Sequence, residues 1–224
     1  IEGQERAVDS YKGLKKSLLQ KMFPKEGEKI PQIRFPGFDG EWEEVQLSQL
    51  GKIQTGKTPK TSDKDNYSDD GILFVTPTDI NGLIVKDSER KLSNKGILKT
   101  KIAKKNSILI TCIASIGKNA ITYEDVGFNQ QINSIELNKN NDPYFFLTSS
   151  IKISHKIKSF ASSGMMQIIN KTDFSNVTTL VPSLPEQKKI GDFFKKLDEL
   201  IEGEEKYLED LKVLKKSLLQ KMFV

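Results

Sequence analysis

The stretch most suggestive of chemistry is Gly51-Lys-Ile-Gln-Thr-Gly-Lys-Thr58, which matches the phosphate-binding pattern G-x-x-x-x-G-K-[ST]. That pattern binds a nucleotide when a buried strand precedes the glycines and a helix follows the lysine, because backbone N–H groups and the helix N-terminus then surround the phosphates. Here Pro59 follows at once, and the polar run up to Gly71 has no apolar helical period. We therefore expect a loop that could contact DNA phosphates, with a P-loop-like nucleotide-binding enzyme as the alternative.

Neither of the other chemistry-bearing patterns supports catalysis. Asn141-Asp-Pro-Tyr144 is one residue away from the Asn-Pro-Pro-Tyr tetrapeptide of amino-group DNA methyltransferases, but the first proline is missing. A helix start explains it better, with Asp142 as the cap and Pro143 at the first helical position. The single His155 and the single Cys112 lie far apart in the chain, without a metal-ligand or nucleophile motif. The sequence therefore predicts no catalytic, metal or cofactor site.

The elements that must position any functional residues begin and end with the same helical sequence. Residues 1–23 read IEGQERAVDSYKGLKKSLLQKMF and residues 201–223 read IEGEEKYLEDLKVLKKSLLQKMF, and the last ten positions are identical. Such a repeat around a dissimilar middle is typical of one period of a larger tandem protein. Because the chain begins with Ile1 rather than Met, we expect a fragment cut inside a repeat.

A long helix is expected over residues 186–224. Ser183-Leu-Pro-Glu186 is a capping box with proline in the first turn, and apolar residues then recur at intervals of three and four. Such a helix needs a partner along its length, and we expect residues 1–23 to run back along it as an antiparallel coiled coil. The residues expected to make the oligomer or partner contacts are Leu197, Leu200, Ile201, Leu208, Leu211, Leu214 and Leu218.

The middle of the chain has a different sequence pattern from its two ends. Residues 24–32 form a linker rich in helix breakers, and residues 33–185 form a globular domain. Short alternating or apolar runs separated by turn residues predict a mostly antiparallel, irregular sheet with one shorter helix at 143–159. The fold class is therefore α+β, a β-rich domain flanked by long helices. The predicted strands are 43–47, 72–75, 83–85, 107–116, 120–123, 131–137 and 177–181.

Composition indicates an intracellular, cytoplasmic protein, and the uneven distribution of its charge leaves a nucleic-acid partner open. Apolar residues make up 36% of the chain, and no run approaches the roughly 18 apolar residues that cross a bilayer. Cys112 has no second cysteine to pair with, and its apolar surroundings predict a packed thiol. The net charge of +5 is modest, but residues 91–118 and 143–172 contain lysines and no acid. These stretches favour nucleic acid, with an ordinary solvated face as the alternative.

Taken in order, the middle domain and the C-terminal helix resemble the specificity subunit of type I restriction-modification systems. The resemblance covers nearly the whole chain and depends on the order of its pieces rather than on any single piece. The pieces are Trp42, Gly56-Lys-Thr-Pro59, Ile72-Leu-Phe-Val-Thr-Pro-Thr-Asp-Ile80, Ile108-Leu-Ile-Thr111, Ser115-Ile-Gly-Lys118, Phe128-Asn-Gln-Gln-Ile-Asn133, Ser163-Gly164 and Val181-Pro-Ser-Leu-Pro-Glu-Gln-Lys-Lys-Ile190 leading into Leu197-Asp198.

The resemblance implies a non-catalytic subunit of a methyltransferase and endonuclease complex. In that family two target-recognition domains, each reading one half of a bipartite site in double-stranded DNA, alternate with two similar long helices. The helices form an antiparallel spacer that docks the methyltransferase subunits, and the restriction subunits complete the complex. This chain holds one such domain, so it is half of a longer subunit or a half-size subunit that forms a homodimer and reads a palindromic split site. A coiled-coil scaffold that reads no DNA is the remaining alternative.

The resemblance also divides the candidate DNA contacts. Elements shared by a family that reads many sequences cannot set the sequence read, so framework or phosphate contacts are expected at Gly56, Lys57, Thr58, Ser115, Gly117 and Asn129–Gln131, Gln130 included. Lysine suits guanine and amide side chains suit adenine, so bases should be read from the less family-like loops by Lys60, Ser62, Lys64, Asn66, Tyr67, Asn119, Ser162, Met165 and Gln167. The DNA backbone should be positioned by Lys101, Lys104, Lys105, Lys118, Lys156 and Lys158.

Overall fold

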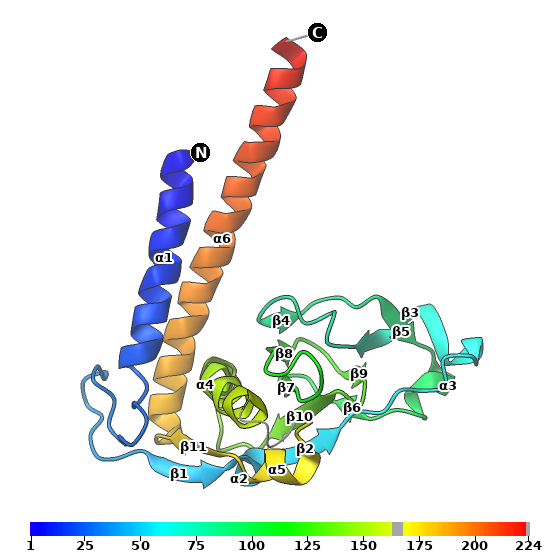
Figure 1. Cartoon of the computed structure of the whole chain (residues 1–224). Coiled ribbons are helices and arrows are strands. Elements are labelled where there is room, and N and C mark those ends of the chain that lie inside the picture. The colour runs from blue at the N-terminus through cyan, green and yellow to red at the C-terminus, as the bar shows by residue number, and fades with distance from the viewer. Residues whose placement is uncertain (163–167, 223–224) are drawn as a thin grey trace. The chain divides into compact units, whose positions relative to one another are not determined.

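A computed structural model describes residues 1–162 and 168–222 of the chain (Figure 1). The chain divides into two compact units, one made of Ile1–Glu41 with Lys189–Val224 and the other of Trp42–Lys188. The first unit contains the repeat helices, and the second contains the β-rich middle. Residues 33–41, expected at the start of the globular domain, group with the helices instead. In the ranges described, no helix is long and apolar enough to cross a bilayer.

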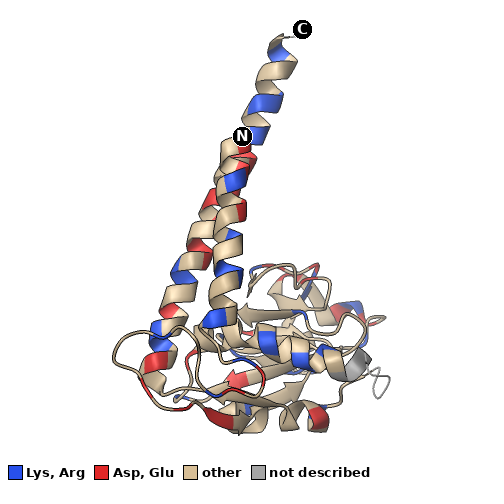
Figure 2. Ribbon diagram, turned by 60° about the vertical axis from the view of Figure 1, so that its left-hand side comes forward, with Lys and Arg blue, Asp and Glu red and all other residues tan. Residues whose placement is uncertain are grey.

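Two antiparallel helices make up most of the first unit. Glu5 pairs with Lys212 at 2.9 Å, and Lys12 pairs with Glu205 at 2.6 Å. Residue numbers therefore decrease along one helix as they increase along the other, so the two helices are antiparallel. Both helices carry acidic and basic side chains, and the charged residues in the last part of each helix are all lysines (Figure 2). The predicted antiparallel coiled coil is therefore confirmed. The two helices are α1 (Glu2–Lys21) and α6 (Leu184–Met222), and α6 begins within the predicted capping box.

The apolar stripe of α6 is buried near the start of the helix and exposed towards its end. Leu197 and Ile201 are each 8% exposed, and Val8 of α1 is 4% exposed. The rings of Phe23 and Phe194 pack with centroids 6.0 Å apart. The end of α6 continues past the first residue of α1 (Figure 1), so α1 cannot cover all of the stripe. The half-buried or exposed stripe residues are Leu200, Leu208, Leu211, Leu214 and Leu218.

The second unit contains three sheets within the described residues. Most strand pairs are antiparallel, as predicted, and the parallel pairs are β3 with β9 and β4 with β8. A two-stranded sheet joins β1 (Glu43–Gln46) to β11 (Thr178–Val181). The five-stranded sheet has the order β2 (Gly51–Thr55), β10 (Ile132–Leu137), β7 (Ile108–Thr111), β8 (Asn119–Thr122) and β4 (Ile84–Val85). The four-stranded sheet has the order β5 (Arg90–Leu92), β3 (Tyr67–Val75), β9 (Val126–Phe128) and β6 (Ile102–Ala103).

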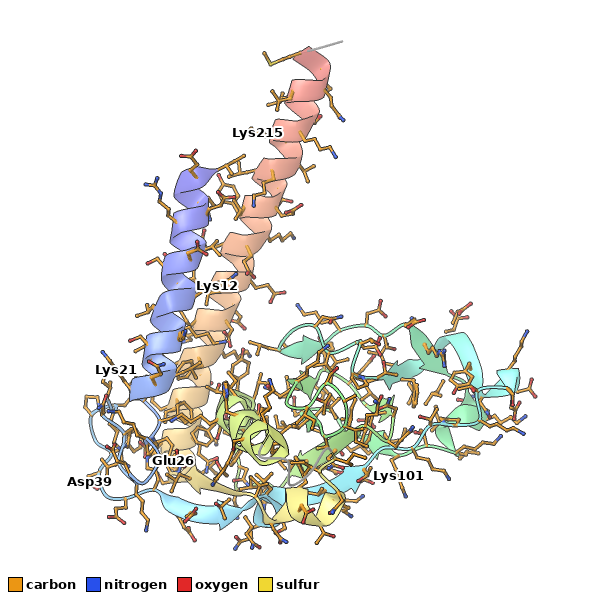
Figure 3. All side chains as sticks on the ribbon, in the orientation of Figure 1. Lys12, Lys21, Glu26, Asp39, Lys101 and Lys215 are labelled. Carbon is orange, nitrogen blue, oxygen red and sulfur yellow. The ribbon has the colours of Figure 1, made fainter. Side chains whose placement is uncertain are left out.

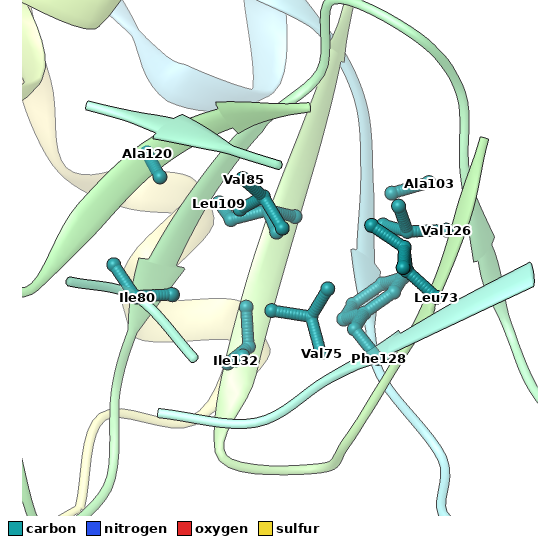
Figure 4. Close-up of a cluster of buried hydrophobic side chains, with 10 residues drawn as sticks. All are labelled: Leu73, Val75, Ile80, Val85, Ala103, Leu109, Ala120, Val126, Phe128 and Ile132. Atoms are coloured by element: carbon teal, nitrogen blue, oxygen red, sulfur yellow. The ribbon is translucent and has the colours of Figure 1, made fainter. Parts of the chain in front are cut away.

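One hydrophobic core lies between the five-stranded and four-stranded sheets (Figure 4). Phe128 at the end of β9 and Ile132 at the start of β10 are both fully buried, so the turn between them connects the two sheets through the core. Burying one such phenylalanine contributes about 1.5–3 kcal/mol. This core holds the loops at the strand ends in place. Its members are Leu73, Val75, Ile80, Val85, Ala103, Leu109, Ala120, Val126, Phe128 and Ile132.

The helices of the second unit begin at caps that the sequence makes recognisable. The Phe145 N–H donates to Asp142 Oδ1 at 2.8 Å, which confirms Asp142 as the cap of α4 (Pro143–Ser162). Cys112 is buried beside Asn133, as expected, and burial raises the pKa of its thiol to about 12. The remaining helices are short: α2 (Leu47–Leu50), η1 (Lys64–Asn66), α3 (Asn94–Ile97) and α5 (Lys171–Asn176).

Two differences from the predicted strands have a local cause. The run 107–116 was expected to be one strand, but β7 ends at Thr111 because the chain then turns back towards β8. In that turn Gly117 has φ +83° and Ala114 has φ +61°. Strands β2, β5, β6 and β9 were not predicted, since each is short and has no clear alternation of apolar and polar residues.

Candidate nucleic-acid interface

The stretch that matches the phosphate-binding pattern is part of the five-stranded sheet. Its first five residues form β2, which pairs antiparallel with β10. A Cβ on Gly51 would lie 2.0 Å from the carbonyl oxygen of Glu136, and a Cβ on Gly56 would lie 2.1 Å from that of Asn129. Both glycines therefore allow two backbones to approach closely, a requirement of the sheet and not of a nucleotide.

The backbone donors of this stretch are already used. The Gly56 N–H donates to the carbonyl oxygen of Ile132 at 3.1 Å, and the Lys57 N–H donates to that of Phe128 at 2.9 Å. A P-loop needs these N–H groups free to point at phosphates, and it needs a helix directly after the lysine. Neither condition is met, so the geometry does not support the nucleotide-binding alternative.

The end of β2 does bring several predicted DNA contacts together. The Thr58 hydroxyl donates to Gln130 Oε1 at 2.6 Å, and the Thr100 hydroxyl donates to the carbonyl oxygen of Lys57. Lys57, Lys101 and Gln130 are exposed, and within the described part of the chain neither lysine forms an ion pair. We call these five residues, Lys57, Thr58, Thr100, Lys101 and Gln130, the Lys57 surface.

The Lys57 surface has the chemistry of a phosphate site. Its two unpaired ammonium groups supply positive charge, and the amide nitrogen of Gln130 supplies hydrogen-bond donors, while the two hydroxyl groups donate within the surface and hold its parts together. Hydrogen bonds tie the strand end, the Phe128–Ile132 turn and the segment before β6 to one another. Lys101, labelled in Figure 3, directly precedes β6. Three segments far apart in the sequence thus form one rigid basic surface.

Asn66, predicted to read a base, is used inside the protein. Asn66 is fully buried, its amide nitrogen donates to the carbonyl oxygen of Lys60 at 2.9 Å, and its amide oxygen accepts from Lys99 at 2.8 Å. A side chain used in this way holds the loop, and base reading by Asn66 stays a prediction that this geometry does not support. The Tyr67 hydroxyl donates to the carbonyl oxygen of Pro59 at 2.9 Å, so it also braces the loop.

The same loop contains an acid, Asp63, whose charge is compensated by lysines, and it carries exposed candidates for DNA contact. Asp63 accepts from Lys99 at 3.1 Å and lies 3.4 Å from Lys95, and these partners lower the pKa of its carboxyl, Lys99 most strongly. The ion pairs fasten the loop to α3, through Lys95, and to the segment after it, through Lys99. The candidates that remain exposed on the loop are Lys60, Ser62 and Lys64.

Lys104 and Lys105 differ in how available their charges are. Lys104 lies 2.7 Å from Asp125, which raises the pKa of Lys104 and lowers that of Asp125. The Lys105 ammonium lies 5.2 Å from the centre of the Tyr123 ring, which is 65% exposed. Lys104 therefore adds little net charge to the surface, since an acid already compensates it, whereas Lys105 keeps its charge over an aromatic face.

The turn between β7 and β8 presents one exposed candidate and engages its neighbours. Ser115 is exposed. The Lys118 ammonium donates to the carbonyl oxygen of Pro77 at 2.8 Å, and the Asn119 amide donates to the Ser150 hydroxyl at 2.7 Å. Lys118 and Asn119 therefore fix the turn against neighbouring segments, and Ser115 is exposed.

The lysines of α4 have structural contacts of their own. Lys156 donates to the Thr178 hydroxyl at 2.9 Å. The aliphatic part of Lys158 packs against Gly117, and a Cβ added to Gly117 would lie 2.6 Å from Cε of Lys158. His155 is exposed. The candidates that fall outside the described residues, by position or by side chain, are Ser162, Met165 and Gln167.

Sequence reasoning missed three residues beside the Lys57 surface. Thr100 belongs to that surface, Lys99 braces the adjoining loop through Asn66 and Asp63, and Leu98, between Lys99 and α3, is 87% exposed. An exposed apolar side chain among lysines could contact a thymine methyl group. The acid-free stretch 91–118 was the signal that could have found them. In the described ranges, no group of three or more His, Cys, Asp or Glu side chains could hold a metal ion.

Curated relatives carry one common description. The protein family described as type I restriction modification DNA specificity domain matches residues 39–213. The HindI specificity subunit of Haemophilus influenzae is 33% identical over 165 residues, which cover 69% of this chain and 36% of that protein. The MjaIX specificity subunit of Methanocaldococcus jannaschii is 25% identical over 191 residues, 82% of this chain and 44% of that protein. The chain thus spans about half or less of the length of these relatives.

Solved structures show the same fold. The HsdS subunit of Thermoanaerobacter tengcongensis matches with a TM-score of 0.67 and 18% identity over 98% of this chain and 52% of that one. The type I restriction-modification S subunit of M. genitalium matches with a TM-score of 0.70 and 16% identity over 98% of this chain and 56% of that one. The mixed α and β fold, the coiled helices and the matched family agree. The chain therefore belongs to the family of type I restriction-modification DNA specificity subunits.

Proposed function

We propose that this chain reads one half of a bipartite DNA site for a type I restriction-modification complex and performs no chemical step itself. The observation that carries the proposal is the Lys57 surface, where cations and donors from three distant segments meet on a rigid strand end. Phosphate contacts of this kind fix the position of a protein on the duplex, and nearby loops can then read bases. Lys60, Ser62 and Lys64 lie on the adjoining loop and suit that second role.

The partners in this proposal are double-stranded DNA and the methyltransferase and restriction subunits. The helical unit is suited to docking a protein, because α6 exposes leucines between charged side chains. Leu214 and Leu218 are 55% and 52% exposed, and such residues, rimmed by charges, are typical of protein contact sites. The second half-site would be read by another recognition domain, supplied by a longer chain or by a second copy of this one.

Mapping of methylated sites tests the proposal. The chain, produced together with a methyltransferase subunit of this family, should direct methylation to a split motif. Lys60→Ala and Ser62→Ala should change or relax one half of that motif and leave the other unchanged. Lys29→Ala is the matched control, since Lys29 is exposed and lies in the helical unit. Methylation that stays at the same motif in both loop variants would contradict base reading by this loop, and a chain that forms a complex but directs no methylation would favour a scaffold.

A further inference from the structure

Arg90 is the only arginine between Trp42 and Lys188, a unit that otherwise uses lysine for positive charge. Its side chain is exposed, and within the described residues its guanidinium forms no ion pair or hydrogen bond. Arginine differs from lysine because its five N–H donors form a planar fork, which fits two neighbouring acceptors at once. The unit therefore presents one free fork to a ligand.

The backbone of Arg90 is fixed at the edge of the four-stranded sheet. Arg90 begins β5 and pairs with Phe74 of β3, beside which β5 lies in Figure 1. The Ser88 hydroxyl accepts from the Phe74 N–H at 3.1 Å and donates to the carbonyl oxygen of Arg90 at 2.6 Å. The N–H of the preceding residue, Glu89, donates to Asp79 Oδ1 at 2.9 Å. On such a fixed strand end, only the side chain of Arg90 must be ordered when it binds a ligand.

Arg90 lies on the face of this sheet that points away from the hydrophobic core. Leu73 and Val75 of β3 belong to the core, so Phe74 between them lies on the opposite face, because side chains alternate along a strand. Paired residues of neighbouring strands share a face, so Arg90 lies on the same side as Phe74. We call this side of the four-stranded sheet the outer face.

The loop proposed to read bases begins on the outer face as well. The Tyr67 ring packs against the Phe74 ring with centroids 6.4 Å apart, and the Tyr67 hydroxyl holds the carbonyl oxygen of Pro59, where the loop begins. Leu92, on the outer face two residues after Arg90, is fully buried with its side chain against α3. Arg90 therefore shares a face with α3 and with the loop that carries the exposed candidates Lys60, Ser62 and Lys64.

The charges around Arg90 fit a base edge better than a phosphate. Asp87 and Glu89 are exposed within three residues of Arg90. A phosphate offers acceptors alone, and these carboxylates would repel its negative charge. In the major groove, a G·C pair offers the N7 and O6 acceptors of guanine beside the N4 donor of cytosine. An arginine fork next to a carboxylate supplies the complementary donors and acceptor.

We propose that Arg90 reads the guanine of a G·C pair in the major groove of the half-site. This inference rests on the proposed function and names one base that the chain reads. The Lys57 surface fixes the duplex through phosphates, and Arg90 adds selectivity for sequence. A bidentate pair between arginine and guanine corresponds to about 5-fold to 150-fold discrimination in affinity.

A guanine analogue tests the proposal with the full chain. The probe is a labelled duplex that carries the mapped methylation motif, in which each guanine is replaced in turn by 7-deazaguanine, which keeps base pairing and lacks the N7 acceptor. For at least one guanine of a half-motif, the replacement should lower the affinity of the wild type by about tenfold and leave that of Arg90→Ala unchanged. Arg90→Lys keeps the charge without the fork, so it should lose most of this response.

The salt dependence of binding separates a base contact from a phosphate contact. Arg90→Ala should keep the slope of log K against log salt, whereas loss of a phosphate contact would reduce the slope by about 0.9. The matched control is Arg6→Ala, which removes an exposed arginine of the helical unit and should keep the response to 7-deazaguanine.

Four results would overturn the reading of guanine by Arg90. They are a reduced slope in Arg90→Ala, a motif without a G·C pair in either half, a wild type that responds to no replacement, and a response that persists in Arg90→Ala. In each case the chain still binds its motif, so the proposed function stands. A chain that directs no methylation and binds no duplex would instead show that the proposed function has failed, and this inference with it.

Discussion

Replacing Lys57 and Lys101 with alanine should weaken binding to every DNA sequence and reduce its salt dependence. Both side chains are exposed on the Lys57 surface, and neither forms an ion pair within the described residues. Their charges are therefore available to phosphates, which release bound counterions when a cation replaces them. Alanine removes the charge and leaves the backbone hydrogen bond from Lys57 to Phe128 intact.

The magnitude follows from counting two phosphate contacts. Each contact changes the slope of log K against log salt by about 0.9, so the double variant should have a slope smaller by about 1.8. If a contact contributes nothing at 1 M salt, this slope makes it worth about 8-fold in affinity at 0.1 M salt. Losing both contacts should therefore lower the affinity at 0.1 M salt by about 60-fold. An effect of this size is far outside the error of an ordinary titration.

Fluorescence anisotropy with a labelled duplex at several salt concentrations measures this slope. The matched control is Lys104→Ala with Asp125→Ala, which removes a lysine and the acid that lies 2.7 Å from it and leaves the net charge unchanged. The control should keep the slope of the wild type. If the double variant of Lys57 and Lys101 folds normally but keeps the slope of the wild type, the Lys57 surface does not contact phosphates.

Two further predictions concern stability and reactivity. Gly56→Ala should destabilise the recognition domain by about 3 kcal/mol or more, because its Cβ would meet a backbone oxygen. Gly203→Ala, with open space around it, should stabilise α6 by about 0.5–1 kcal/mol. Urea unfolding of both variants checks the sign of each change, and a Gly56→Ala variant as stable as the wild type would refute the close approach. The thiol of Cys112, with its pKa raised to about 12, should resist a thiol reagent at pH 8 until the chain unfolds, and the stability that it contributes should be complete below about pH 8.5 and lost as the pH rises towards 12. Rapid labelling of the folded chain, or an alkaline stability profile identical in Cys112→Ala, would count against this burial.

The coiled coil could be predicted from sequence because its signals are local. A few turns of sequence are enough to show the helical spacing of apolar residues. The sequence repeat at the two ends of the chain then indicates which two helices pair. Strands such as β5 and β6 gave no comparable signal. They are three and two residues long, and each is held by a partner strand far away in the chain, which periodicity within a short window cannot reveal.

Tertiary partners decide which of the predicted DNA contacts are available in the folded chain. Asn66 lies in a polar stretch and looks exposed, but Lys99, 33 positions later, reaches back to its amide. Lys104 lies in an acid-free stretch, but Asp125, 21 positions later, compensates its charge. Lys57 and Lys101 kept their predicted availability because no acid folds back onto them within the described residues. Charge counted along a sequence therefore predicts a basic region better than it predicts which of its lysines is available.

The pattern at Gly51–Thr58 illustrates why residue types alone do not define a phosphate site. A nucleotide-binding loop and this strand end use the same glycines, lysine and threonine, but the direction of the backbone N–H groups differs. Here those groups point into the sheet, at Ile132 and Phe128, so only side chains face solvent. Side-chain donors around a rigid strand end can contact the phosphates of a long duplex, which offers many anions in a row, but they cannot surround a single triphosphate. The sheet partner of β2 thus decides which of the two ligands this sequence can bind.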